Sequence, residues 1–285
     1  MEVRRVARRD DGGTLQDFLA AWLGISRRAA KAIVDGRRVW VNRRCVWMAH
    51  HRLKTGDVVE VPRVPAPSPA RAPERQHVRV LVETQDFLVV DKPSGMLSCG
   101  ESGSVEAVLR EQLQSSGIQP VHRLDRGTSG CLMFAKTSVA RDAAVEVFKT
   151  HRVSKTYFAV VAGRYPYAKQ TIDAPIDGER AVTHVSREMS SEDATLLRVR
   201  IETGRTHQIR RHLASVRFPV IGDRTFGPKN VRDPRMMAVP RLMLHAAALA
   251  LPDPTVKGGE IKARSPMPAD FRAALRMFGL GRRGK

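Results

Sequence analysis

The sequence is poor in the features that define several common classes of protein. Its cysteines, Cys45, Cys99 and Cys131, are odd in number and far apart, and no CxxC pair occurs. This spacing supports neither a disulfide framework nor a zinc site, and it favours a reducing compartment. No apolar run is long enough to span a bilayer, and the first residues lack the apolar core of a secretory signal. We therefore expect a soluble, cytoplasmic monomer with no membrane contact.

Motifs for nucleotide cofactors and metals are also missing. The chain has no GxGxxG segment after an expected strand, no Walker sequence, and no histidine or cysteine cluster at metal-ligand spacing. These absences predict that the protein uses no cofactor and no metal. They also disfavour an RNA methyltransferase, because such an enzyme needs a glycine-rich cofactor loop after a strand.

Acidic residues are scarce relative to basic ones, 29 against 49, which gives a formal net charge of +20. The excess is concentrated in two segments. Residues 1–63 hold 14 Lys or Arg and 7 acidic residues, and residues 205–241 hold 9 and 2. A biased overall composition would spread positive charge evenly, whereas a polyanionic partner favours clusters of it. The charge pattern therefore predicts binding to nucleic acid.

A proline-rich segment divides the chain into two expected units. Five prolines in the twelve residues 62–73 exclude a helix or a central strand, so residues 63–76 are expected to form an extended linker. It separates a small domain over residues 13–62 from a catalytic domain over residues 77–280. In the larger domain, expected strands outnumber helices and often follow one another directly. This order predicts an α+β fold rather than a doubly wound parallel sheet.

The small domain has the expected order of two helices and short strands. Thr14 caps the helix TLQDFLAAWL, and Ser26 caps the helix SRRAAKAIVD. The strands RRVWVN and DVVEV follow. This order resembles the S4 RNA-binding module, and it implies that one face of the second helix contacts RNA phosphates, although a solvated face is the simpler alternative. The residues concerned are Arg27, Arg28 and Lys31.

Asp125 lies in the motif VHRLDRGTSGC, between an apolar lead-in and a turn with two glycines. The apolar residues before it indicate the end of a strand, Gly127 and Gly130 permit a tight turn, and CLMFA indicates the next strand. Asp125 would therefore lie at a fixed place on a rigid rim. The local pattern leaves two roles open, a catalytic carboxylate or a residue that caps the turn through its own backbone.

The segment HRLDRGTSG resembles the catalytic motif of the RluA-type pseudouridine synthases, which isomerise uridine to pseudouridine in RNA. Three more segments resemble the same family in the same order, namely KTYFAVV, ETGRTHQIRRHLASVRFPVIGD and RLMLHAAALALP. The resemblance covers residues 14–277. It implies a mixed, mainly antiparallel sheet with flanking helices, no cofactor, and ribosomal RNA of the large subunit as substrate, with transfer RNA as the next candidate. Phe226 stands where the family usually has tyrosine, a departure that concerns RNA contact or packing.

The resemblance implies that Asp125 is catalytic, acting on the sugar carbon or on the base. In a partly dry site its carboxylate needs a cation beside it to stay ionised. Arg210 in QIR is the expected partner, with Arg205 and Arg211 as alternatives, and all three could instead contact only phosphate. Arg205 is also expected to bind RNA. On a helix Arg210 and Arg211 point about 100° apart, so they are not expected to share the role.

The resemblance implies that Tyr157 stacks on the uracil or exchanges a proton with it, and that Leu244 forms an apolar floor under the base. Ordinary core packing would explain both residues equally well. A uridine in folded RNA must be flipped out of its stack, and the resemblance implies that Arg123, with His122, holds the opened RNA. The competing hypothesis is a ribosome-associated binding protein with an S4 module and no catalysis, which need not retain these residues.

Overall fold

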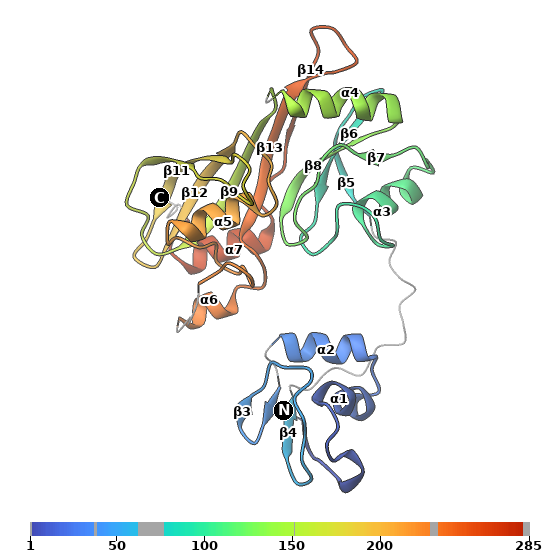
Figure 1. Ribbon diagram of the computed structural model, residues 1–285, viewed down its shortest axis with the longest axis vertical. Helices are drawn as coiled ribbons and strands as arrows, with labels where there is room; N and C mark the ends of the chain where they lie inside the picture. Colours follow the sequence, from blue (N-terminus) through green and yellow to red (C-terminus); the bar gives the residue numbers. More distant parts are fainter. Residues whose placement is uncertain (1, 37–38, 62–76, 151, 229–232, 282–285) are drawn as a thin grey trace. The chain divides into compact units, whose positions relative to one another are not determined.

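The computed structural model describes residues 2–36, 39–61, 77–150, 152–228 and 233–281. The chain forms two compact units, Met1–Glu74 and Arg75–Lys285, each with its own apolar core (Figure 1). The linker expected over residues 63–76 lies outside the described residues. Within the described residues, no helix is both long and apolar enough to cross a membrane.

The first unit packs two helices against a small antiparallel sheet. The hydroxyls of Thr14 and Ser26 accept backbone hydrogen bonds at 3.2 Å from Asp17 and Ala29, so both expected helix caps are confirmed. One strand lies before residue 13, where the domain was expected to begin. The elements are β1 (Glu2–Arg5), η1 (Arg8–Asp10), α1 (Leu15–Leu23), α2 (Arg27–Asp35), β2 (Trp40–Val41), β3 (Arg44–Cys45) and β4 (Val58–Val61), with strand order β1-β4-β2-β3.

The second unit is built on one ten-stranded sheet with the order β10-β11-β12-β9-β13-β8-β6-β5, to which β14 adds beside β13 and β7 beside β8. All its pairs are antiparallel except β13 with β8. The α+β prediction with a mixed, mainly antiparallel sheet is therefore confirmed. The strands are β5 (Arg79–Glu83), β6 (Phe87–Lys92), β7 (Gln119–Pro120), β8 (Ser129–Ala135), β9 (Ser154–Ala162), β10 (Lys169–Asp173), β11 (Val182–Ser190), β12 (Ala194–Ile201), β13 (Leu244–Pro252) and β14 (Glu260–Arg264).

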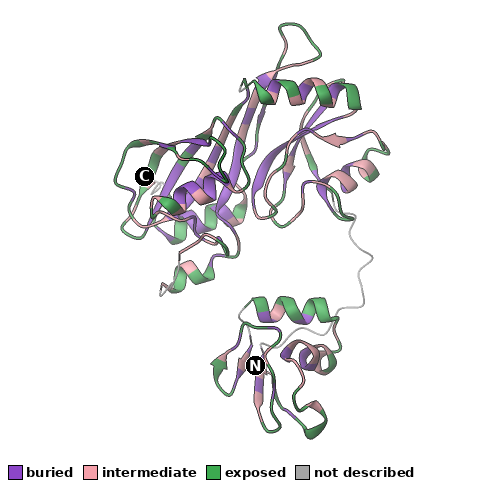
Figure 2. Cartoon of the chain, viewed as in Figure 1, coloured by how far each residue is buried: buried purple, intermediate pink, exposed green. Residues whose placement is uncertain are grey.

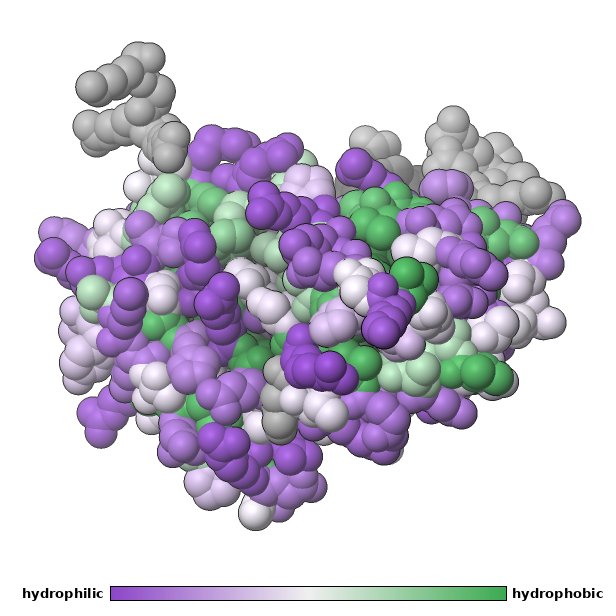
Figure 3. Space-filling model, turned by 90° about the horizontal axis from the view of Figure 1, so that it is seen from above, coloured by the Kyte–Doolittle hydropathy of each residue, from purple (hydrophilic) through white to green (hydrophobic). Residues whose placement is uncertain are grey.

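The helices of the second unit are α3 (Val105–Gln112), α4 (Ser138–Lys149), α5 (Gln208–Ser215), α6 (Pro234–Ala238) and α7 (Ala269–Met277). Four of them, α3, α4, α5 and α7, bury part of their surface, whereas α6 buries no residue. Figure 2 shows that the strands are mostly buried while the helices expose their outer faces. The expected helices near residues 139–149 and 207–214 are present, and three others were not anticipated. Figure 3 shows one face of the molecule, on which hydrophilic side chains predominate and hydrophobic ones form small, separate groups.

The parallel junction of β8 and β13 explains the second glycine of the Asp125 motif. Gly130 pairs with Ala246 and has φ +111°. A Cβ atom there would lie 2.2 Å from the carbonyl oxygen of Ala246. Only glycine permits both this backbone angle and this close approach. The loop that carries Asp125 is thereby anchored at its C-terminal end in the centre of the sheet.

Candidate active site

Asp125 lies on a loop between β7 and β8 and not at the end of a strand. The sequence predicted strand up to Leu124, but β7 ends at Pro120. The prediction of the strand end was wrong because the backbone of Leu124 bonds to a side chain instead of a neighbouring strand. The Ser98 hydroxyl accepts from the Leu124 N–H at 3.0 Å and donates to its carbonyl at 2.9 Å. A turn in which the Thr128 N–H donates to the Asp125 carbonyl, at 3.0 Å, completes the loop.

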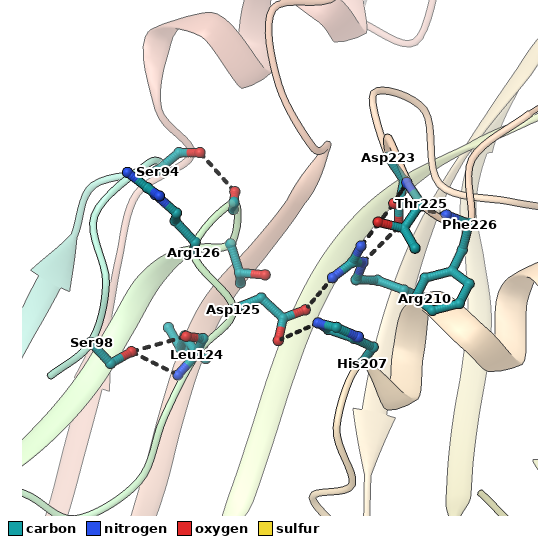
Figure 4. Close-up of polar contacts among 12 residues, drawn as sticks. Ser94, Ser98, Leu124, Asp125, Arg126, His207, Arg210, Asp223, Thr225 and Phe226 are labelled. Atoms are coloured by element: carbon teal, nitrogen blue, oxygen red, sulfur yellow. Dashed lines mark hydrogen bonds and ion pairs between the residues drawn. The ribbon is translucent and has the colours of Figure 1, made fainter. Parts of the chain in front are cut away.

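The segment after β6 holds the Asp125 loop on both sides of the carboxylate. Ser98 fixes Leu124 before it, and the Ser94 hydroxyl donates to the carbonyl of Gly127 after it, at 2.7 Å (Figure 4). These contacts join segments that are about thirty residues apart in the sequence. The loop is therefore rigid without strand pairing, which is what a catalytic side chain requires of its support.

Lys92, the last residue of β6, lies fully buried beneath this loop. Its Nζ lies within hydrogen-bond distance of three backbone carbonyls, those of Pro93 at 3.0 Å, Arg126 at 3.1 Å and Thr128 at 2.8 Å. Three acceptors match the three N–H donors of an ammonium group. Burial lowers the pKa of Lys92 to about 7 from its ordinary 10.5, and the negative charge of Asp125 opposes part of this shift. Sequence analysis gave Lys92 no role.

We expect Lys92→Met to lower the free energy of unfolding by about 1–3 kcal/mol for each loop carbonyl left unsatisfied, and to lower turnover by misplacing Asp125. The pH dependence has a defined sign. Because the folded pKa lies below the ordinary value, the unfolded chain holds more protons on Lys92 between pH 7 and 10.5. The wild-type advantage in unfolding free energy should therefore increase with pH across this window.

Chemical denaturation of both proteins across a pH series measures this advantage. Lys149→Met is the control, because Lys149 is an exposed residue paired with Glu146 on the surface of α4. It measures how the loss of an exposed lysine changes the free energy of unfolding at each pH. A difference in unfolding free energy between Lys92→Met and the wild type that does not change with pH would contradict the lowered pKa of Lys92.

Arg210, on α5, joins Asp125 to a second carboxylate. Its Nη1 donates to Asp125 Oδ2 at 3.0 Å, while Nε and Nη2 donate to Asp223 at 2.6 and 2.8 Å (Figure 4). The side chains of Arg210, Asp223 and Asp125 are 10%, 1% and 25% exposed. Asp223 thus fixes the guanidinium in a two-point geometry that only arginine supplies. Of the N–H groups that Asp223 does not bind, one on Nη1 donates to Asp125.

The electrostatics of this cluster favour the ionised forms of Arg210 and Asp223. Burial alone would raise the pKa of Asp223, but hydrogen bonds from Arg210 and from the Phe226 and Thr225 N–H groups outweigh it and hold that pKa below its usual range. Burial would likewise lower the pKa of Arg210, and the two carboxylates outweigh it and raise that pKa. The Phe226 ring lies 5.1 Å from the guanidinium and covers one of its faces.

The two alternative partners of Asp125 point elsewhere. Arg211 forms a two-point ion pair with Asp177 at 2.8 and 2.9 Å, on the exposed side of α5. Arg205 pairs with Glu179 and donates to a backbone carbonyl. Of the three candidate arginines, the structure brings Arg210 alone to the carboxylate of Asp125.

His207 is a second neighbour of Asp125 that sequence analysis missed. Its Nε2 lies 3.9 Å from Asp125 Oδ1, the oxygen that Arg210 leaves unbound (Figure 4). His207 precedes α5 and has φ 55°, a left-handed backbone conformation that residues other than glycine rarely adopt. Its ring lies 5.6 Å from the ring of Phe226. The sequence contained no signal for this conformation beyond the position of His207 next to the QIR segment.

Tyr157 lies on β9 and is almost completely buried. It pairs with Ala246 of β13 and Val199 of β12, while its neighbour Phe158 points to the opposite face. Burial, together with the negative charge of Asp125, raises the pKa of Tyr157. Within the described residues its hydroxyl has no hydrogen-bond partner, so a neutral phenol is available to a ligand beside Asp125.

Two other expected contacts receive less support. Leu244 lies within the apolar core of the second unit, 3% exposed, so core packing accounts for its position. The His122 ring stacks on Phe148 at 5.0 Å, and its Nε2 accepts from the Met133 N–H at 3.1 Å. Burial and the charge of Lys155 lower the pKa of His122 to about 3. A neutral, packed ring argues against the expected phosphate contact.

The expected RNA-binding residues outside this centre lie at the surface. Arg123 is exposed. On α2, Arg28 is exposed, while Arg27 pairs with Asp17 and Lys31 with Asp35, each at 2.7 Å. Surface pairs of this kind are weak, so they could open for a phosphate.

The arrangement offers one carboxylate oxygen held by Arg210 and another open toward His207, beside a buried phenol. Such a centre can supply a nucleophile or stabilise a developing positive charge on a sugar. Among the described residues, no group of three histidine, cysteine or acidic side chains could hold a metal ion. The geometry presents the carboxylate of Asp125 with one oxygen bound by Arg210 and the other open.

Comparison with known proteins gives consistent findings over both units. A family model described as RNA pseudouridylate synthase matches residues 86–215, and an S4 domain model matches residues 14–59. The uncharacterized RNA pseudouridine synthase YlyB of Bacillus subtilis is 34% identical over 272 residues, which cover 86% of this chain and 87% of the relative. The ribosomal large subunit pseudouridine synthase D of Xanthomonas campestris is 34% identical over 255 residues, covering 78% and 76%. The solved structure of human RNA Pseudouridylate Synthase Domain Containing 1 has a TM-score of 0.60 at 26% identity, covering 68% of this chain and 85% of that one.

Proposed function

Because this chain belongs to the RNA pseudouridine synthases and carries an S4 module, we propose that it isomerises specific uridines in ribosomal RNA of the large subunit, with Asp125 as the catalytic group. The observation that carries the assignment of Asp125 is its contact with Arg210, which Asp223 orients. If Asp125 only capped a turn, it would not need an arginine that a buried, two-point ion pair with Asp223 holds in place. The same contact disfavours a binding protein without catalysis.

The reaction is an internal rearrangement of one nucleotide. The bond between N1 of uracil and C1′ of ribose breaks, the base turns, C5 bonds to the same C1′, and the proton from C5 is replaced by one on N1. No electrons or groups are exchanged with a second substrate. The open oxygen of Asp125 acts either on C1′ or on the ring, and the hydrogen bond from Arg210 orients the carboxylate during both steps.

The uridine must leave its stack to reach Asp125, so the mechanism includes base flipping. Tyr157 would contact the flipped base, with its ring for stacking and its neutral hydroxyl for a proton transfer. Arg123 would hold the opened RNA, since it is exposed two residues before Asp125. The positive charge of residues 205–241 would contact the surrounding phosphates.

The proposed RNA substrate is supported by relatives named for the large ribosomal subunit, and it places the protein in the cytoplasm with the ribosomes. Mapping pseudouridine in total cellular RNA, with and without the gene, tests it. We expect one or more positions of large-subunit RNA to lose the modification and to regain it with the wild-type gene but not with Asp125→Asn. Loss of pseudouridine only in transfer RNA would show that transfer RNA is the substrate instead. No loss of pseudouridine in any RNA would contradict the proposal.

We expect Tyr157→Phe to lower turnover by about a hundredfold while RNA affinity changes little, because the ring remains and only the hydroxyl is lost. Single-turnover rates at saturating RNA, with separate binding measurements, give both quantities. Tyr165→Phe is a matched control, since this tyrosine loses a hydroxyl that bonds to Gln170 instead. A rate for Tyr157→Phe equal to that of the control would limit Tyr157 to stacking or packing.

A further inference from the structure

The turn after β3 in the first unit presents two large apolar side chains to solvent. Trp47 is 59% exposed and Met48 is 56% exposed, while the residues on either side of them, Val46 and Ala49, are buried. Exposed apolar side chains that lie next to each other are informative, because they offer a surface that a ligand can cover. The pair therefore presents apolar area to a ligand from a position fixed by two buried neighbours.

The exposure of Trp47 and Met48 belongs to a fixed backbone. The Val46 N–H donates to Val39 at 2.9 Å, and the Ala49 carbonyl accepts from the Gln16 N–H at 3.1 Å. Within the turn, the His51 N–H donates to the Met48 carbonyl at 3.0 Å. The two side chains thus stand on a supported turn, and a ligand that contacts them would not have to order a loose loop.

The sequence around this turn is strongly basic. From residue 36 to residue 56 it contains no acidic residue, and it contains Arg37, Arg38, Arg43, Arg44, Arg52 and Lys54 together with two histidines. Asp57, which follows, binds the Asn42 side chain at 2.8 Å and the Lys54 N–H at 2.8 Å, so both its oxygens are occupied within the unit. The apolar pair therefore lies within a strongly basic stretch of the sequence.

The β2–β3 hairpin places two of these arginines beside the turn. Asn42 and Arg43 have φ 50° and 63°, as in the tight turns that join two neighbouring strands. Among the described residues, neither Arg43 nor Arg44 forms an ion pair, whereas two basic residues of α2, Arg27 and Lys31, do. Basic side chains without an ion pair among the described residues therefore lie at the β2–β3 hairpin, in addition to the face of α2 that the sequence predicted to bind RNA.

We propose that Trp47 and Met48 form a stacking site for an unpaired base of the RNA, with Arg43 and Arg44 contacting the flanking phosphates. An aromatic face surrounded by cations suits single-stranded RNA, because each base offers a flat face and each linkage a negative charge. A duplex hides its base faces, and an apolar protein partner would not favour so dense a positive charge. The inference rests on the proposed function only in that RNA is the partner.

The test compares full-length Trp47→Ala and Trp47→Phe with Tyr167→Ala, an exposed aromatic on the second unit that serves as control. The probes are a short RNA oligonucleotide without self-complementarity and the duplex of the same sequence. We expect Trp47→Ala to weaken binding to the single strand about tenfold, Trp47→Phe to retain most of the affinity, and duplex binding to be unchanged. The double variant R43A/R44A should lower the slope of log affinity against log salt by about 1.4, and Trp47→Ala should not change it.

Unchanged affinity of Trp47→Ala for the single strand, or an equal loss for strand and duplex, would overturn the stacking site. Unchanged RNA affinity together with altered self-association, measured by light scattering, would assign the turn to a protein contact and overturn it equally. Trp47→Ala should still unfold cooperatively and keep its turnover at saturating RNA. Absence of pseudouridine formation by the wild-type chain would instead contradict the proposed function and leave the binding comparison intact.

Discussion

Asp125→Asn should lower the rate of pseudouridine formation by roughly a thousandfold or more while the fold and RNA affinity remain. The amide keeps an oxygen that can accept from Arg210 Nη1, so the ion-pair geometry has a near-isosteric replacement. It lacks the negative charge that attacks carbon or stabilises a sugar cation. The measurement is a single-turnover rate on the RNA identified by mapping, with binding measured separately.

Asp177→Asn provides a matched control for this variant. Asp177 also accepts from an arginine of α5, but its partner is Arg211 and the pair is exposed. We expect this control to retain the wild-type rate and nearly the wild-type stability. A rate near wild type for Asp125→Asn as well would show that the carboxylate is not the catalytic group.

Local sequence signals predicted the parts of the fold that depend on neighbours along the chain. Thr14 and Ser26 mark the helix starts because a cap acts within three residues. The alternation of Tyr157 and Phe158 gave the two faces of β9 because side chains in a strand alternate. The order of segments also indicated the mixed sheet, although not the parallel pairing of β13 with β8, which joins residues more than a hundred positions apart.

The support of the active site could not be predicted in the same way. Lys92, Ser94 and Ser98 act on backbone atoms of the Asp125 loop, and such contacts leave no periodic pattern in the sequence. The choice of Arg210 over its neighbours depended on the direction of α5 and on Asp223, which binds two of its nitrogens. His122 showed the reverse, since a residue in the catalytic motif is used for packing.

Arg210→Ala should lower the free energy of unfolding by about 3–5 kcal/mol, because it leaves the Asp223 carboxylate, 1% exposed, without its cation. It should also lower turnover by about a hundredfold or more, since Asp125 loses its oriented partner. Arg211→Ala is the adjacent control on the same helix. Its surface pair with Asp177 contributes at most about 1 kcal/mol, and turnover should stay near wild type.

Stability and catalysis separate in the double variant R210M/D223L. Replacing both members of a buried ion pair with apolar groups removes the unpaired charge, so the unfolding free energy should recover much of the loss seen in Arg210→Ala. Turnover should stay low, because neither methionine nor leucine can donate to Asp125. Chemical denaturation and single-turnover rates on the wild type, R210M, D223L and the double variant, which form a complete double-mutant cycle, measure both effects. If the double variant regained the wild-type rate, Arg210 would serve the fold alone, and Asp125 would need another group to hold it in place.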